Sequence, residues 1–234
     1  LILEYLNDNK YKNLKLELLD KKINIKMISK ISRDLLKIHK NSTSKYIKKR
    51  FLKNSKNFYD LRLDAYFNEI ARVHPKIKNK IKKIITSYNE NSTTLVHGDF
   101  SPKNMLVYKN NIKYLDAETS NYGDPAFDLT YFANHLLIKS IHIPSMKNAF
   151  INCYEIFFKT YLKSLNLKER TILFSRCILM VPMLLLARVD GKSPVEYITK
   201  TKTKTKIRLL AFKLIDNPPE SLDKLIDNLN ESRI

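Results

Sequence analysis

The chain has 234 residues, 44% of them hydrophobic and 28% charged, which excludes a disordered chain and leaves ample core for one large domain or two small ones. Its formal net charge of +20 raises the question of nucleic-acid binding. The charge is mostly scattered lysine, without the interleaved aromatic residues that stack on bases. A solvated basic surface, which also suits anionic ligands, is therefore the better interpretation, and a nucleic-acid partner the weaker one.

Two further features favour a soluble protein in a reducing compartment. The most apolar run, residues 177–187, is bordered by Arg176 and interrupted by Pro182. It is also shorter than the roughly 18 to 20 residues of a membrane span, so it predicts a buried helix and no membrane partner. Cys153 and Cys177 lie in apolar, helix-like surroundings, which favours two reduced core thiols over a disulfide or a metal pair. Since nothing at the start resembles a signal peptide, we predict a cytoplasmic protein.

The first part of the chain predicts a short strand followed by helices. Residues 1–6 (LILEYL) form an apolar run typical of the end of a strand. Apolar residues recur at helical spacing over residues 28–38 and 77–88. Residues 60–73 also read as a helix, which is expected to end near His74-Pro75.

A small β-hairpin is predicted next, and helices follow it. The strand-like runs are residues 94–96, 105–108 and 112–115, with a polar loop after the first run and a turn at 109–111. From Pro125 onward we expect helices, over residues 126–138, 146–162, 169–187, 207–215 and 221–229. The chain has no internal repeat and no linker long enough to divide two domains. The predicted fold is α+β, mostly α, with one small functional hairpin.

Three oxygen-bearing side chains are expected to converge at one end of this hairpin. Asn104 lies just before one strand and Asp116 just after its partner, so pairing of the strands brings them to the same end. Asp99 lies in the loop that leads to that end. Such hard oxygen ligands suit Mg²⁺, which usually takes one or two carboxylates and completes its shell with water and substrate phosphates. The remaining carboxylate is free to accept a proton from a hydroxyl nucleophile.

The motifs around these residues resemble those of a known enzyme family. His97-Gly98-Asp99 is followed by Asn104, then by LDAE at residues 115–118 and GDPAFDL at residues 123–129. This ordered set is similar to the aminoglycoside phosphotransferase / choline kinase-like family, which shares the protein-kinase fold. The resemblance covers essentially the whole chain as a C-terminal lobe and is densest between residues 95 and 137.

The resemblance implies a reaction and the residues that perform it. Asp99 is expected to be the catalytic base, with Asn104 and Asp116 as Mg²⁺ ligands. The reaction is transfer of a phosphoryl group from ATP to a hydroxyl of a small-molecule substrate. Lys103 is either a contact to the transferring phosphate or a solvated loop lysine.

Other motif residues are expected to hold the loop rather than to react. His97 would do so through hydrogen bonds and Gly98 through its backbone geometry. Asp128 is expected at the start of a helix, where it would accept hydrogen bonds from backbone N–H groups of the catalytic loop. The role of Glu118 stays open between support of the metal site and contact with the substrate.

A charged turn, residues 187–194 (ARVDGKSP), follows the longest apolar run. In the family that the chain resembles, late helices of the C-terminal lobe build the acceptor pocket. Arg188, Asp190 and Lys192 are therefore candidate substrate contacts, and the alternative is an ordinary helix end followed by a turn. His135 is a further pocket candidate, although a core histidine with satisfied hydrogen bonds is the favoured interpretation.

A kinase of this fold also needs an N-terminal lobe, in which a Gly-rich loop and a strand lysine hold ATP. No such loop is expected here, because the chain has three glycines and all are assigned elsewhere. By resemblance, residues 1–6 look like a remnant of the hinge strand, whose backbone near Glu4 and Leu6 would meet adenine. Residues 7–234 would then form the helical lobe that carries the catalytic and substrate residues.

The predicted function is therefore that of an ATP- and Mg²⁺-dependent small-molecule kinase, present as a fragment without its N-terminal lobe. One alternative is a catalytically incompetent remnant that folds and binds ligands. The other, weaker alternative is a basic nucleic-acid-binding protein. Neither the acceptor nor the oligomeric state is predicted.

Overall fold

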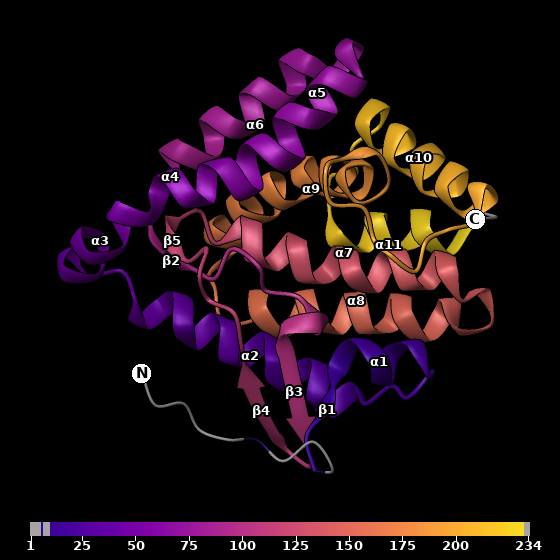
Figure 1. The fold of residues 1–234 in the computed structure, drawn as a ribbon, viewed down its shortest axis with the longest axis horizontal. Coiled ribbons are helices and arrows are strands. Elements are labelled where there is room, and N and C mark those ends of the chain that lie inside the picture. Colours follow the sequence, from indigo (N-terminus) through magenta and orange to yellow (C-terminus); the bar gives the residue numbers. More distant parts are fainter. Residues whose placement is uncertain (1–5, 7–9, 232–234) are drawn as a thin grey trace.

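Helix α7 (Ala126–His142) lies at the centre of the molecule, and its residues are buried in succession from Ala126 to Ile141. A helix without a solvent-facing side must be covered all round. In the computed structural model, which describes Leu6 and residues 10–231, α8 (Lys147–Leu162), α9 (Leu167–Asp190) and α10 (Thr201–Asp216) pack against it (Figure 1).

The remaining helices surround this centre. They are α1 (Leu14–Leu19), α2 (Ile25–Asn41), α3 (Lys45–Phe51), α4 (Ser55–Phe58), α5 (Glu69–Val73), α6 (Lys78–Glu90) and α11 (Leu222–Glu231). Four single 3₁₀ turns lie between elements, at Leu52–Asn54, Pro75–Ile77, Pro102–Asn104 and Pro144–Met146. Helices α2 and α11 pack on α8, whereas α5 and α6 pack on α9.

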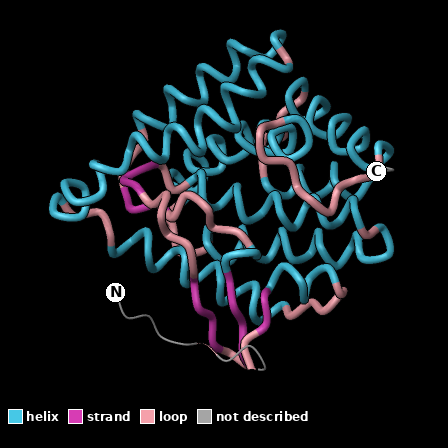
Figure 2. Tube along the Cα trace, in the orientation of Figure 1, coloured by secondary structure: helices cyan, strands magenta, loops and turns pink. Residues whose placement is uncertain are grey.

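The strands form two small antiparallel sheets (Figure 2). The predicted hairpin is confirmed, because β3 (Met105–Tyr108) pairs with β4 (Asn111–Tyr114), and β1 (Lys12–Asn13) extends this sheet beside β3. The run at β2 (Thr94–Val96) is a strand but pairs elsewhere, with β5 (Asn121–Gly123), which the sequence did not predict. The fold class is thus α+β and mostly α, as predicted.

The helices after Pro125 fall where they were predicted, with one shifted start. α10 begins at Thr201, six residues before the predicted helix, because its first turns carry exposed Thr and Lys and have no apolar periodicity. The segment predicted as a helix over residues 60–73 is helical and ends at Val73, but Tyr59–Asn68 forms a π-helix. π-Helical segments are rare and often occur at functional sites.

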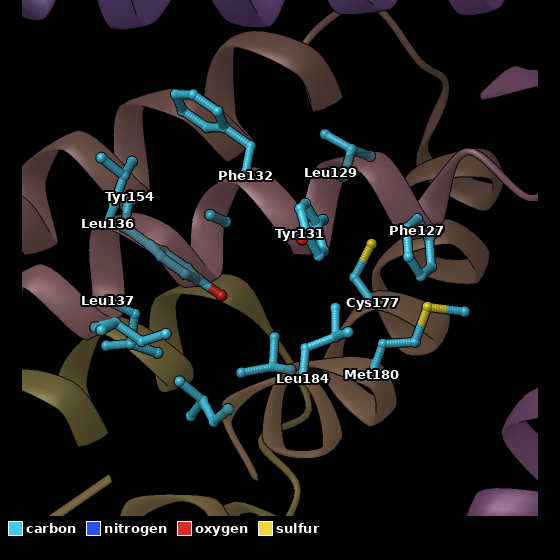
Figure 3. Close-up of a cluster of buried hydrophobic side chains, with 14 of the residues drawn as sticks. Phe127, Leu129, Tyr131, Phe132, Leu136, Leu137, Tyr154, Cys177, Met180 and Leu184 are labelled. Carbon is cyan, nitrogen blue, oxygen red and sulfur yellow. The ribbon is translucent and has the colours of Figure 1, made fainter. Parts of the chain in front are cut away.

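The core is built where α7 meets α8 and α9. Figure 3 shows this packing, in which the labelled residues are Phe127, Leu129, Tyr131, Phe132, Leu136 and Leu137 of α7, Tyr154 of α8, and Cys177, Met180 and Leu184 of α9. Cys153 and Cys177 are free and buried, as predicted, and burial raises the pKa of each thiol to about 12. Both thiols therefore stay protonated and unreactive at neutral pH.

Helix α9 contains the apolar run that was predicted to be buried. By length and composition it could cross a membrane, with a mean hydropathy of 2.0 over an 18-residue window. However, 78% of that window is buried inside the fold. It therefore serves as a core helix, which is consistent with a soluble protein.

The predicted hinge strand, with its candidate nucleotide contact Glu4, lies outside the described residues except for Leu6. Leu6 is half-buried and belongs to neither a helix nor a strand. The site residues that follow all lie in the described part of the chain.

Candidate active site

The loop that follows β2 is tied to the first turn of α7 by Asp128. Its Oδ2 accepts a hydrogen bond from the backbone N–H of His97 at 2.7 Å, and its Oδ1 accepts one from Gly98 at 3.0 Å. Asp128 is completely buried, and His39 Nε2 lies 3.4 Å from its Oδ2. Both carboxylate oxygens are thus satisfied by partners that also set the direction of the loop.

Gly98 gives the loop its sharp turn before Asp99. Its φ is +77°, a region that residues with a Cβ rarely adopt. A Cβ here would also lie 2.7 Å from Oγ1 and 2.8 Å from the carbonyl oxygen of Thr119. Both the conformation and the space require glycine at this position.

The ring of His97 connects the loop to the end of the hairpin. Nε2 lies 3.1 Å from the carbonyl oxygen of Leu115, and Nδ1 accepts a hydrogen bond from the backbone N–H of Asp99 at 3.2 Å. These two partners require the proton on Nε2 of a neutral ring. His97 thereby holds Asp99 next to the residue that precedes Asp116.

Asp99 differs from Asp128 because only one of its oxygens is used. Oδ2 forms ion pairs with Nη2 of Arg62 at 3.2 Å and with Nζ of Lys103 at 2.8 Å. Oδ1 is buried and has no hydrogen-bond partner among the described residues. Buried polar atoms are nearly always paired, so an unpaired carboxylate oxygen in a loop held this firmly indicates a place for a ligand.

The charge of Asp99 is set by two opposing effects. Burial raises the pKa of its carboxyl group, but the cations of Arg62 and Lys103 outweigh burial and hold the pKa below its usual range. Asp99 is therefore ionised at neutral pH and is able to accept a hydrogen bond from a hydroxyl group.

The two predicted Mg²⁺ ligands lie at the same end of the hairpin. Asn104 donates from Nδ2 to the backbone oxygen of Asp99 at 3.0 Å, and its own backbone oxygen accepts from Leu115 N at 2.9 Å. The next residue, Asp116, is exposed and has a φ of +62°. A residue other than glycine in this region carries strain, which tends to persist at functional sites.

These donors fit Mg²⁺ in its usual open form. Within the described part of the chain, no three His, Cys, Asp or Glu side chains gather into a metal cage. Mg²⁺ does not need one, since it keeps several waters and binds substrate phosphates. The amide oxygen of Asn104 and the carboxylate of Asp116 make no hydrogen bond or ion pair with the other described side chains, so both are available.

Lys103, the third predicted nucleotide contact, lies beside Asp99. Its side chain is 46% exposed while it pairs with Oδ2. Its ammonium group therefore contacts Asp99 on one side and solvent on the other.

The three candidates in the charged turn have separate surroundings. Arg188 is buried and donates from Nη1 to Tyr66 Oη at 3.1 Å and to the backbone oxygen of Ser193 at 2.6 Å. Both carboxylate oxygens of Asp190 lie 3.0 Å or less from the guanidinium of Arg208, and Oδ2 is also 2.9 Å from His74 Nε2. Lys192 pairs with Asp64 at 3.1 Å. Of the three, Arg188 is the one that the fold brings toward Asp99. Burial lowers the pKa of Arg188, but Tyr131, Tyr66 and Tyr197, and to a smaller extent Asp99, raise it above its usual value.

Three residues near Asp99 had no motif to reveal them. Arg62 and Tyr66 come from the π-helix, and Tyr131 comes from α7. The guanidinium of Arg62 lies 5.7 Å from the ring centroid of Tyr66, and Tyr66 Oη is 2.9 Å from Tyr131 Oη. The one available signal was the spacing of Arg62 and Tyr66, four residues apart on one helix face.

Comparison with known families places these residues in context. The model of the ecdysteroid kinase-like family matches residues 1–167. This family belongs to a protein-kinase-like superfamily related to choline kinase and the aminoglycoside phosphotransferases. The kinship predicted from the motifs is therefore confirmed at this broader level, whereas the narrower family assignment is not. No curated protein matches the chain.

Proposed function

The chain belongs to the ecdysteroid kinase-like family, and on that premise we propose that it provides the catalytic C-terminal lobe of a soluble, cytoplasmic ATP-dependent kinase that phosphorylates a small-molecule hydroxyl group. The observation that carries this proposal is the unpaired Oδ1 of Asp99. It is the oxygen to which an acceptor hydroxyl would donate its hydrogen bond.

Asp99 would align the acceptor and take its proton. As the hydroxyl oxygen bonds to the γ-phosphorus of ATP, the bond between that phosphorus and the bridging oxygen breaks and ADP leaves. The hydroxyl proton passes to Oδ1 of Asp99. The low pKa of Asp99 makes it a weak base, which suits a reaction in which alignment and charge neutralisation matter more than early proton removal.

Arg62 and Lys103 would have different duties in this reaction. Arg62 is nearly buried and also donates from Nε to the backbone oxygen of Gly98, so it fixes both the loop and the carboxylate. Lys103 is half-exposed, so its ammonium group would pair with a phosphate oxygen in front of Asp99. We assign Arg62 to positioning and Lys103 to the phosphate.

Asn104 and Asp116 would hold Mg²⁺. When bound, the ion neutralises part of the charge of the ATP phosphates. The chain's contribution would be to present the amide oxygen of Asn104 and the exposed carboxylate of Asp116 from the same end of the hairpin.

Exchange of Asp99 for alanine tests the proposal in the enzyme that contains this lobe. We expect phosphoryl transfer from Mg-ATP to fall by about a thousandfold or more, while the affinity for Mg-ATP stays within about twofold. Asp227→Ala, which removes an exposed carboxylate on α11, is the matched control and should leave transfer unchanged. Full activity of Asp99→Ala would rule out this role, and binding of Mg-ATP without transfer by the unmodified protein would favour a catalytically incompetent remnant.

A further inference from the structure

Buried positive charge gathers on the side of α7 that lies beyond Asp99. Lys139 is completely buried and Arg188 is 7% exposed. In the described part of the chain, neither side chain forms an ion pair with a carboxylate. Lysine and arginine are almost never buried this deeply without a counter-ion. His135, whose pKa burial lowers and which is therefore neutral, lies one helical turn before Lys139. We call these three residues the cationic cluster, after the charges of Lys139 and Arg188.

Two nitrogen atoms of the cationic cluster are unused. Nε of Arg188 and Nε2 of His135 are both buried without a hydrogen-bond partner among the described residues. The hydrogen bonds that Arg188 makes with Tyr66 and Ser193 all run through Nη1. This leaves the edge formed by Nε and Nη2, which is one of the edges with which arginine binds a carboxylate or phosphate through two parallel hydrogen bonds.

The surroundings of the cationic cluster are themselves positive. Burial lowers the pKa of His135 most strongly, and the cations of Arg188, Lys139, Lys103 and Lys15 lower it further. Burial likewise lowers the pKa of Lys139 to about 7. Among the described residues, the acidic group that acts on Lys139 is Glu196, whose side chain is 64% exposed and paired with Lys15 at 2.6 Å. Lys139 therefore has no buried carboxylate as an ion-pair partner among the described residues.

The cationic cluster is connected to Asp99 through a short chain of contacts. Arg62 pairs with Asp99 and lies over the ring of Tyr66, and Arg188 lies over the same ring at 5.7 Å. Tyr66 joins Arg188 to Tyr131 through its hydroxyl group, and the ring of Tyr131 is 5.3 Å from that of His135. These contacts join the surroundings of Asp99 to the cationic cluster.

We propose that His135, Lys139 and Arg188 bind an anionic group, a carboxylate or a phosphate, of the acceptor whose hydroxyl group meets Asp99. The inference rests on the proposed kinase function and names its substrate class, a hydroxylated anion. The anion supplies the missing counter-charge and accepts the unused hydrogen bonds of Arg188 and His135. A cationic acceptor such as an amino sugar or a quaternary amine would face like charges and is excluded.

The ion pair between Lys15 and Glu196 lies at the edge of the cationic cluster. It joins α1 to the segment after α9, whose Tyr197 accepts a hydrogen bond from Lys139 at 3.2 Å.

Thermal unfolding of the chain tests this inference without ATP or phosphoryl transfer. The probes are sodium D-glycerate and inorganic phosphate, with glycerol and choline as uncharged and cationic controls, all at constant ionic strength. We expect at least one anion to raise Tm by about 3 °C or more at saturation, and glycerol and choline to leave it unchanged. The anion with the larger effect identifies the group, carboxylate or phosphate.

Variants separate this site from a general effect of anions on a basic protein. Lys139→Met keeps the size and apolar stem of the side chain, so it should fold, and it should lose the anion-induced rise in Tm. Arg188→Gln should lose the same rise if it folds, and Lys82→Met, on the exposed face of α6, should keep it. Equal effects of all four probes, no effect of either anion, or an anion effect that persists in Lys139→Met would overturn the inference. Anion binding without phosphoryl transfer would instead contradict only the proposed kinase function.

Discussion

The two ends of α7 bury charge in opposite ways. At its start, Asp124 and Asp128 are completely buried acids with a partner for each oxygen: Arg176 and the backbone N–H of Ala126 for Asp124, and two loop N–H groups for Asp128. Toward its end, His135 and Lys139 are buried bases with an unused donor and no counter-ion among the described residues.

This difference distinguishes buried charges that stabilise the fold from those that are available to a ligand. A buried charge whose bonds are complete holds elements together, and it has no capacity left for a ligand. A buried charge that the fold leaves incomplete costs stability, which proteins tolerate mainly at functional sites. Asp99 lies between the two cases, with one oxygen paired and the other free.

The largest expected effect on stability concerns the start of α7. Asp128→Ala leaves the buried N–H groups of His97 and Gly98 without acceptors and should cost about 3 to 5 kcal/mol in the free energy of unfolding. Urea denaturation measures this loss. Asp223→Ala on the exposed side of α11 is the control, and an equally small change in both variants would mean that the loop does not depend on Asp128.

Arg176→Ala tests the start of α7 in a second way, because the stability of this variant should depend on pH. Burial raises the pKa of Asp124 even beside Arg176, and removal of the guanidinium should raise it further. A raised pKa in the folded state favours the protonated acid, so the stability of the variant falls as pH rises through that value. We expect a loss of about 3 kcal/mol at pH 7 and a smaller loss at pH 4. Urea denaturation at both pH values checks the slope, and Lys168→Ala should show no such pH-dependent loss.

The other end of α7 should show the opposite dependence on pH. The pKa of Lys139 falls from 10.5 to about 7 in the folded state, because burial opposes its charge. The unfolded chain therefore binds more protons between pH 7 and 10.5, and stability contributed by this group rises with pH across that window. Relative to Lys139→Met, the unmodified chain should gain about 3 kcal/mol between pH 7 and 10. If the free energy of unfolding changed with pH in the same way in both proteins, burial of Lys139 would not lower its pKa, and the account would be contradicted.

Local patterns predicted the longer helices and the hairpin, but not the short helices α1 and α3 or the contacts that make the site. The periodicity of α7 and α9 and the β3–β4 turn lie within continuous stretches of sequence. The pairing of β2 with β5 was missed because Asn121–Gly123 is short and has no apolar alternation. Arg62 was missed because nothing within a π-helix indicates that its side chain meets Asp99, 37 positions away in sequence. The motif residues were found because their order along the chain is enough to identify them, without knowledge of their three-dimensional surroundings.

The stability of two matched exchanges tests the central claim most directly. Asp99→Asn and Asp128→Asn each replace a buried carboxylate with an amide of the same shape. In Asp128→Asn the amide can accept only one of the two loop hydrogen bonds and turns its own N–H₂ group toward the other donor. We expect this variant to lose at least about 2 kcal/mol more in the free energy of unfolding at pH 7 than Asp99→Asn. An equal or larger loss in Asp99→Asn would mean that Asp99 is a structural residue, and it would contradict the division between satisfied and unsatisfied buried charge.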